Sequence, residues 1–331
     1  MHYMSLGNSG LRVSRIGLGC MSYGRPEQGA HQWTLDEEEA KPLLHAAFDA
    51  GINFFDTANI YSLGSSEEIL GRAIKDFGRE KVVLATKVYE TMDPSSPVSG
   101  GLSRKSILYE VEDSLRRLGT DYIDLYIIHR WDYSTPIEET MATLDFLVRQ
   151  GKVRYLGASS MFAWQFAKAQ NAAEINGLTP FISMQNHHNL IYREEEREMI
   201  PYCRHHGVAT TPWSPLARGL LARPADGGTP PTLRTNHDPI IERFYTQTAQ
   251  LDRETIRTVQ LISEEIGTTM ASVALAWSLH QPTVAAPIVG ATRPQHLTDA
   301  VTAVNTTLTD EHLERLERTY TPHPIAELSP A

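Results

Sequence analysis

Hydrophobic positions along the chain fall into short apolar runs that alternate with stretches of helical periodicity. The opening segment, residues 3–17, carries turn residues from Asn8 to Gly10 and predicts a β-hairpin. Eight apolar runs of strand length then follow. The predicted strands span residues 16–20, 52–56, 82–86, 122–128, 153–158, 181–185, 208–213 and 283–289.

The helical stretches indicate how each strand connects to the next. Thr34 is the expected N-cap of the first helix, and Gly51 is expected to end it. Eight successive β/α units predict an α/β fold, a closed (β/α)8 TIM barrel with an N-terminal hairpin and extra helices. No linker divides the chain, so we expect one domain over residues 1–331. Helices are predicted over residues 35–50, from about 65 onward, and over 103–118, 136–150, 162–176, 194–206, 252–266, 294–303 and 310–319.

Two long loops interrupt this alternation, at residues 89–102 and 214–250. The second is rich in Pro, Gly and Thr, and loops of such length are usually functional. Its part from 222 to 245 is expected to act as a lid over a pocket.

Composition narrows the class of partner. The formal net charge of −10 disfavours binding to nucleic acid or to an anionic membrane. No segment approaches the ~20 apolar residues of a membrane span. Cys20 and Cys203 offer neither a disulfide framework nor a metal motif, which favours a cytoplasmic location. We expect a protein that acts on a small molecule; the sequence does not predict its oligomeric state.

Four polar residues stand at or just beyond the ends of predicted strands, namely Asp56, Tyr61, Lys87 and His129. In a parallel barrel these ends share one face, where barrel enzymes keep their sites. A phenol beside an ammonium can protonate a carbonyl oxygen as a hydride arrives. Asp56 would orient Lys87, and His129 would donate a hydrogen bond to the substrate oxygen or relay the proton. Each residue alone has an ordinary structural explanation, but the four together favour catalysis.

Long stretches around these residues resemble the aldo-keto reductase family. GINFFDTANIYSLGSSEEILGRAI (51–74) is similar to the family's signature segment nearly throughout. The resemblance covers almost the whole chain in the expected order and is strongest to the bacterial and fungal branch. It implies reduction of an aldehyde or ketone with NADPH, with NADH possible, and a tetrad at the four residues above. Further matching segments are residues 84–87, 118–132, 151–160, 183–198, 211–221 and 274–282.

The resemblance also implies a cofactor that lies across the barrel mouth without a Rossmann domain. Residues 17–22 (GLGCMS) carry only two glycines of the dinucleotide fingerprint, which is too little to indicate one. By resemblance, Ser159 and Gln185 bind the nicotinamide carboxamide. Trp213 stacks on the nicotinamide ring, with core packing as the alternative explanation.

The phosphates and the adenosine are expected at two later loops. NADPH is favoured because Arg293, at a helix N-terminus, suits a 2′-phosphate. His296 and Ala300 depart from the residues of many relatives, so fewer adenine contacts are expected. Arg234, in the long loop, either reaches the cofactor or lies on the surface. The implied pyrophosphate residues are Ser214, Leu216, Arg218 and Gly219, and those of the adenosine end are Gly290, Thr292, Arg293 and Asp299.

The substrate pocket is expected to include Tyr23, Tyr89 and Trp131, which suit an apolar or sugar-like carbonyl compound. His187 and His188 are adjacent on a strand end and should point apart, so no metal is expected.

Two alternative functions stay open at this point. One is a nicotinamide-nucleotide-sensing interaction protein, like the family's channel β-subunits. The other is non-redox barrel chemistry with a Schiff base on Lys87, which Asp56 disfavours because it keeps the amine protonated.

Overall fold

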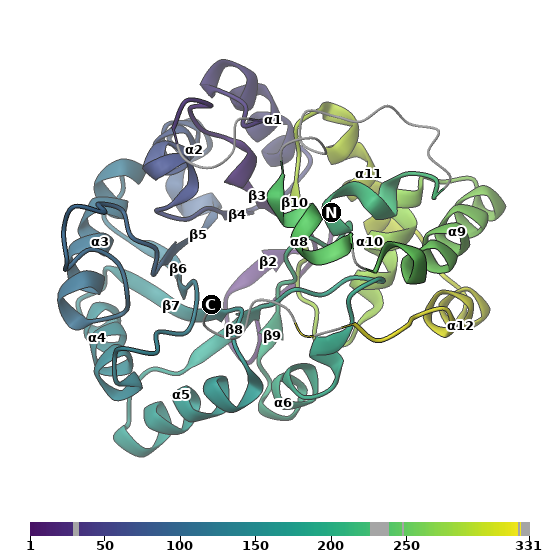
Figure 1. Cartoon of the computed structure of the whole chain (residues 1–331). Helices are drawn as coiled ribbons and strands as arrows, with labels where there is room; N and C mark the ends of the chain where they lie inside the picture. Colours follow the sequence, from purple (N-terminus) through teal and green to yellow (C-terminus); the bar gives the residue numbers. More distant parts are fainter. Residues whose placement is uncertain (29–32, 226–237, 247, 324, 326–331) are drawn as a thin grey trace.

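The computed structural model describes residues 1–28, 33–225, 238–246, 248–323 and 325. Eight parallel strands form one sheet in the order β10-β3-β4-β5-β6-β7-β8-β9. Bridges from Thr210 to Val284 and from Trp213 to Ile288 join β9 and its continuation to the β10 side, so the sheet closes (Figure 1). The predicted barrel is confirmed. The strands are β1 (Tyr3–Ser5), β2 (Arg12–Ser14), β3 (Gly17–Gly19), β4 (Phe54–Asp56), β5 (Val83–Val88), β6 (Ile123–Ile128), β7 (Val153–Ser159), β8 (Phe181–Gln185), β9 (Ala209–Thr210) and β10 (Ile288–Gly290).

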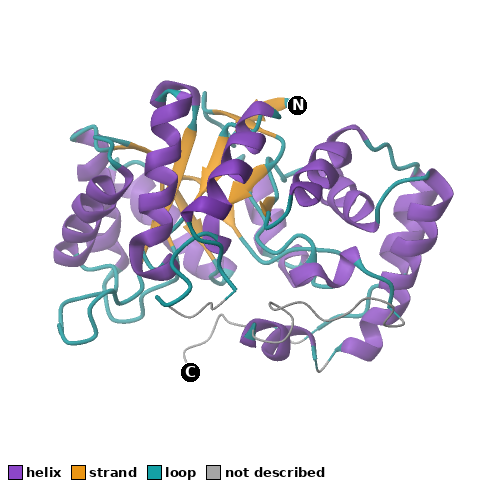
Figure 2. Cartoon of the chain, turned by 90° about the horizontal axis from the view of Figure 1, so that it is seen from above, coloured by secondary structure: helices purple, strands orange, loops and turns teal. Residues whose placement is uncertain are grey.

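Helices surround the strands on the outside of the barrel (Figures 1 and 2). Most connect one strand to the next, while α9, α10 and α12 gather on one side. Among the helices of the described ranges, none combines the length and the apolar character that a bilayer crossing requires. The helices are α1 (Glu37–Asp49), α2 (Ser65–Phe77), α3 (Arg104–Leu118), α4 (Ile137–Arg149), α5 (Ala163–Asn176), α6 (Met199–His206), α8 (Pro239–Tyr245), α9 (Ala249–Ile266), α10 (Met270–His280), α11 (Pro294–Asn305) and α12 (Asp310–Arg318).

Asp36, and not Thr34, caps the first helix. Its carboxylate accepts a hydrogen bond of 3.0 Å from the backbone N–H of Glu39, whereas Thr34 is buried. The helix begins at Glu37, so only residue 36 can reach the third N–H of the first turn. Gly51 follows the helix end with φ 86°, a backbone conformation that favours glycine, as predicted.

Other predictions from periodicity also differ from the structure. The last two strands are shorter than predicted: within 208–213 only Ala209–Thr210 form a strand, and within 283–289 only Ile288 and Val289 do, while Trp213 and Val284 are joined by isolated bridges. The predicted helix 194–206 begins with a separate 3₁₀ turn, Glu194–Glu196. Helices α8 and α10 were not predicted. Residues 270–278 of α10 are buried all round, so this helix lacks the polar face that reveals a helical period.

The N-terminal hairpin is confirmed, and it seals one end of the barrel. Strands β1 and β2 pair antiparallel. Leu6 and Val13 are buried in one cluster with Phe54, at the start of its strand. Gly7 has φ 60°, and a Cβ atom there would lie 2.4 Å from the carbonyl oxygen of Ile182, so only glycine fits. The opposite end, where the strands terminate, is left for the site.

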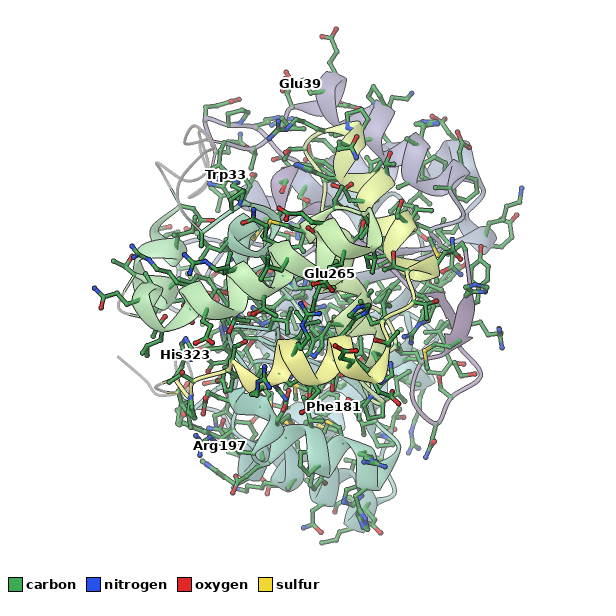
Figure 3. The ribbon with its side chains drawn as sticks, turned by 90° about the vertical axis from the view of Figure 1, so that its right-hand side faces the viewer. Trp33, Glu39, Phe181, Arg197, Glu265 and His323 are labelled. Carbon is green, nitrogen blue, oxygen red and sulfur yellow. The ribbon has the colours of Figure 1, made fainter. Side chains whose placement is uncertain are left out.

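The last helix docks beside α9 rather than on the barrel (Figure 3). Arg315 of α12 makes two hydrogen bonds of 2.6 and 2.7 Å to Glu265 of α9. Beyond α12, the backbone N–H of His323 donates to Glu194, and its imidazole lies 2.8 Å from Asp252. The C-terminal segment is therefore fastened to the loop that follows β8.

Candidate active site

The barrel brings the four strand-end residues together. Asp56 ends β4, Lys87 lies in β5, His129 follows β6 directly and Tyr61 lies in the loop after β4. The amine of Lys87 lies 2.5 Å from Asp56 Oδ1, 2.8 Å from the carbonyl oxygen of Thr57 and 3.3 Å from the hydroxyl of Tyr61. One buried amine thus joins three of the four residues.

Lys87 stays charged in this environment. It has no exposed surface, and burial alone would lower the pKa of its amine. Asp56 and then Tyr61 outweigh that effect, so the pKa of Lys87 lies above its ordinary value. An ammonium has three N–H groups, and here each has one acceptor. The phenol oxygen of Tyr61 therefore accepts from Lys87, and its own proton is free for another acceptor.

His129 is held as a neutral imidazole beside this group. Its ring meets the ring of Tyr61 edge to face at 5.8 Å. Burial, followed by the charges of Arg130 and Lys87, places the pKa of His129 well below its ordinary value. A neutral imidazole keeps one N–H donor, which suits a hydrogen bond to an uncharged oxygen.

The residues expected to bind the nicotinamide have hydrogen-bond partners near the ends of the strands. The amide nitrogen of Gln185 donates to Asp56 Oδ2 over 2.9 Å. The indole N–H of Trp213 donates to Ser160 Oγ over 3.0 Å, and that oxygen lies 3.1 Å from Ser159 Oγ. Gln185 thus joins the end of β8 to the carboxylate of Asp56.

The loop after Trp213 is a tight turn with partners of its own. Arg218 and Gly219 have φ of 58° and 95°. The N–H of Gly219 donates to the carbonyl oxygen of Leu216 over 2.8 Å, and the buried guanidinium of Arg218 pairs with buried Asp238 at 2.9 Å. Ser214 begins the turn with φ 51°. The Gly219 amide and the Arg218 side chain therefore each have a partner within the protein.

The residues expected to bind the adenosine end of the cofactor lie around the start of α11. Gly290 and Arg293 are exposed, and Thr292 donates its N–H to His296 Nδ1 over 3.2 Å. Asp299 accepts a hydrogen bond of 2.8 Å from Gln295 on the same helix.

Arg223, which had not been predicted, lies close to this end. Burial lowers the pKa of its guanidinium, and the charge of Arg293 lowers it further. Neither arginine has an ion-pair partner within the described ranges. Two like charges are thus placed near one another beside a helix N-terminus. Arg234 and half of the predicted lid, residues 226–237, lie outside the described residues.

The expected substrate residues separate into two groups. Tyr23 has no exposed surface and packs in the main core cluster, so in this structure it does not line an open pocket. Tyr89 and Trp131 are partly exposed on the loops after β5 and β6. Trp131 meets Trp164 at 5.9 Å in an edge contact, and Trp164 is 56% exposed. Trp164 adds an aromatic side chain that the sequence had not singled out.

Comparison with known proteins decides the family. The family model described as "Aldo/keto reductase family" matches residues 15–321. The chain belongs to the aldo/keto reductase family. It is 47% identical over 345 residues to versiconal hemiacetal acetate reductase of Aspergillus parasiticus, with 98% of each chain covered. It is 44% identical over 349 residues to a Schizosaccharomyces pombe protein provisionally named aryl-alcohol dehydrogenase, with 98% and 97% covered.

This membership confirms the resemblance found in the sequence, including its fungal branch. An aldo/keto reductase is an oxidoreductase that acts on carbonyl and alcohol groups and uses NAD(P)H. Its substrates are small molecules.

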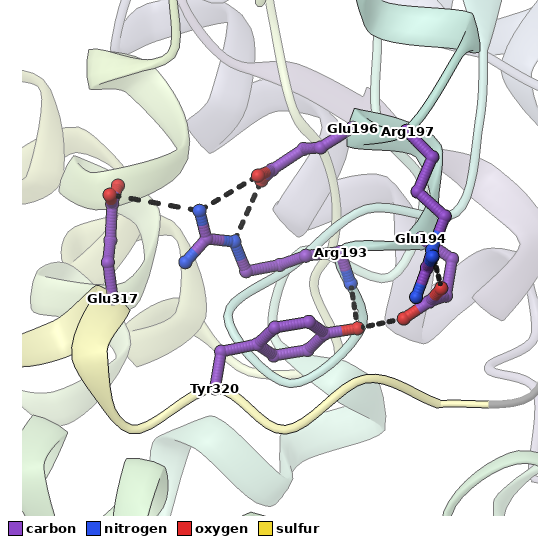
Figure 4. Close-up of a pocket in the computed structure, with 6 residues that line it drawn as sticks. All are labelled: Arg193, Glu194, Glu196, Arg197, Glu317 and Tyr320. Carbon is purple, nitrogen blue, oxygen red and sulfur yellow. Dashed lines mark hydrogen bonds and ion pairs between the residues drawn. The ribbon is translucent and has the colours of Figure 1, made fainter.

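A separate cavity of about 350 Å³ is lined by residues between β8 and α6 and by residues of α12 and the segment after it (Figure 4). Its charged groups pair with one another: Arg193 lies 2.8 Å from Glu196, and Arg197 lies 2.5 Å from Glu194. Tyr320 completes the group through its hydroxyl, which donates to Glu194. The cavity therefore belongs to the anchorage of the C-terminal segment.

The adjacent histidines of the reductase have different partners. His187 Nε2 lies 2.7 Å from the hydroxyl of Tyr245, while His188 Nε2 lies 2.8 Å from Glu196. In the described part of the chain, no cluster of three or more His, Cys, Asp or Glu residues has a metal-binding arrangement. Sequence reasoning missed the partners Tyr245 and Asp238, because no local pattern links them to residues earlier in the chain.

Proposed function

We propose that this aldo/keto reductase reduces an aldehyde or ketone with NADPH and that Tyr61 supplies the proton. The observation that carries the proposal is the saturated ammonium of Lys87. Because all three of its N–H groups have acceptors, Lys87 stabilises a phenolate on Tyr61 without competing for the substrate. Because the ammonium of Lys87 has no lone pair, it does not attack a carbonyl carbon, which disfavours a Schiff base.

The residues of the site take separate roles in this reaction. His129 donates a hydrogen bond to the substrate oxygen, which places that oxygen beside the hydroxyl of Tyr61. Tyr61 transfers its proton to the oxygen, and Lys87, held by Asp56, stabilises the phenolate that remains. When bound, the reduced nicotinamide supplies the hydride.

The donor set fits a nicotinamide nucleotide. Ser159 and Gln185 present a hydroxyl and an amide beside the catalytic carboxylate, and Trp213 offers a partly exposed indole for ring stacking. Arg223 and Arg293 lie close together, and a 2′-phosphate would relieve the repulsion between them. This pair supports NADPH over NADH.

The aromatic rim supports an aryl or similarly apolar carbonyl substrate. Tyr89 and Trp131 stand on the loops after β5 and β6, and Trp164 lies in the first turn of α5, after β7, at the end of the barrel where His129 lies. The two indoles touch and leave ring surface open. The provisional name of the fission-yeast relative points to the same class, aryl alcohols and their aldehydes.

The experiment is a direct assay of cofactor oxidation. Purified protein with NADPH and an aromatic aldehyde should lose the absorbance of the reduced nicotinamide, faster than with NADH or with a short aliphatic aldehyde. Tight NADPH binding without turnover of any carbonyl, together with a stable stoichiometric protein partner, would instead support a sensing role. Trapping of a substrate adduct on Lys87 by borohydride would contradict the reduction mechanism.

A further inference from the structure

A stack of aromatic rings lies behind Trp213. The ring of His187 lies 4.2 Å from the indole with the planes 11° apart, and the ring of Tyr192 lies 4.1 Å from His187 with the planes 12° apart. Two rings stacked this closely cannot share one face, so His187 is enclosed between Tyr192 and Trp213. Phe244 meets both His187 and Trp213 edge-on, at 5.3 and 6.1 Å.

Polar contacts hold the edge of the His187 ring. Asn189 donates its amide to the carbonyl oxygen of Ser214 over 3.0 Å and accepts from the N–H of Ile191, which sets the orientation of the amide. The same amide nitrogen lies 3.3 Å from both His187 Nε2 and the hydroxyl of Tyr245. That hydroxyl lies 2.7 Å from His187 Nε2. Burial places the pKa of His187 well below its ordinary value, so the ring is neutral.

The indole of Trp213 is thereby held on several sides. Ser160 binds its N–H, Phe244 meets it edge-on and His187 covers one face. Trp213 keeps partial exposure despite these contacts. Asn189 adds a tether, because it holds the carbonyl oxygen of Ser214, the next residue in the chain.

We propose that His187 is a positioning residue that holds the indole of Trp213 in the plane on which the nicotinamide ring stacks. This rests on the proposed function, in which the uncovered face of Trp213 receives that ring. His187 itself touches neither cofactor nor substrate. Its contribution is preorganisation: an indole fixed before binding loses less conformational freedom when the cofactor arrives.

The test is a double-mutant cycle on NADPH binding. An aromatic stacking contact corresponds to about a three- to tenfold change in Kd. His187→Leu should therefore weaken NADPH binding by about that factor when Trp213 is present. In a Trp213→Ala background the same change should have no further effect, because His187 acts only through the indole. An equal effect in both backgrounds, or no effect in either, would overturn the inference.

Matched variants separate positioning from general stability. His187→Phe keeps a stacking ring and should recover most of the affinity. Tyr245→Phe removes only the hydrogen bond and should raise Kd by less than His187→Leu. His206→Leu removes a comparable stack, 4.2 Å from Tyr202 on exposed α6, and should leave Kd unchanged.

These controls keep the outcomes distinct. If His187→Leu does not fold, the Phe variants decide. Tyr245→Phe should then change Kd more than His206→Leu does, and an equal or smaller change would overturn the inference. If the wild-type protein binds and oxidises NADPH but the effects of His187→Leu and Trp213→Ala on Kd simply add, only this inference is overturned. Wild-type protein that binds no nicotinamide nucleotide would overturn the proposed function and this inference with it.

Discussion

The hydroxyl of Tyr61 lies 3.3 Å from the ammonium of Lys87, which has no exposed surface. The other two N–H groups of this ammonium bind Asp56 and the carbonyl oxygen of Thr57. The phenol therefore faces a fixed positive charge that cannot turn toward the substrate. This relationship gives Tyr61 the surroundings of a proton donor.

Replacement of Lys87 by Met should reduce both activity and stability. Asp56 would keep Gln185 as a partner but lose its counter-charge, and an uncompensated buried charge costs about 3 kcal/mol of unfolding free energy. We expect kcat to fall at least about 100-fold. Denaturant unfolding and steady-state kinetics measure the two effects. Lys41→Met, in an exposed pair with Asp76, is the control and should change neither. A Lys87→Met variant with wild-type kcat would refute the role given to the ammonium.

His129 should leave no break in the pH–rate profile near neutrality. Burial lowers the pKa of His129 below its ordinary value, so the imidazole is already neutral above about pH 6.5 and loses its neutral form only in more acidic solution. We expect kcat/KM to show no histidine ionisation between about pH 6 and 9. His129→Gln keeps an N–H donor and should retain more activity than His129→Leu. A profile with a break near pH 6.5 that disappears in His129→Gln would show a proton-relay role instead.

Arg293→Ala should change cofactor preference rather than chemistry. If Arg293 and Arg223 hold a 2′-phosphate, loss of one guanidinium should raise the KM for NADPH about tenfold or more and leave the KM for NADH nearly constant. Parallel titrations with both cofactors measure the ratio. Arg204→Ala, on exposed α6, is the matched control. Equal weakening of both cofactors would show that Arg293 does not recognise the phosphate.

The buried carboxyl of Glu195 should make the free energy of unfolding depend on pH, independently of catalysis. Burial, followed by repulsion from Glu194, raises the pKa of Glu195 to about 8. The folded state then binds this proton more tightly than the unfolded state, so the contribution of Glu195 declines as pH rises from about 4.5 to about 8. Glu195→Gln should be more stable than wild type at pH 9, by at most about 5 kcal/mol, and similar at pH 4. A stability difference that does not change with pH would contradict this account.

The sequence could predict the barrel and the meeting of Asp56, Lys87 and His129 for one reason. Each residue lies at or next to the carboxyl end of a strand, and the closed parallel sheet brings these ends to one rim. Tyr61 could be predicted to lie near these residues because only four residues separate it from Asp56. The catalytic roles themselves stay predictions.

Other features depend on contacts that no local pattern contains. The pair of Arg218 with Asp238 and the bond of His187 to Tyr245 each link a residue before position 226 to one after position 237. Helix α10 was missed because burial on all sides removes its period. Thr34 and Asp36 are both good capping residues, and only the observed start of α1 chooses between them.

The most direct measurement of the central claim compares wild type with Tyr61→Phe under single-turnover conditions with NADPH and an aromatic aldehyde. The change removes one hydroxyl and leaves the ring, so NADPH should bind with an unchanged Kd. The rate of nicotinamide oxidation should fall about 100-fold or more, because the proton donor is gone. Oxidation at the wild-type rate in Tyr61→Phe would contradict the account.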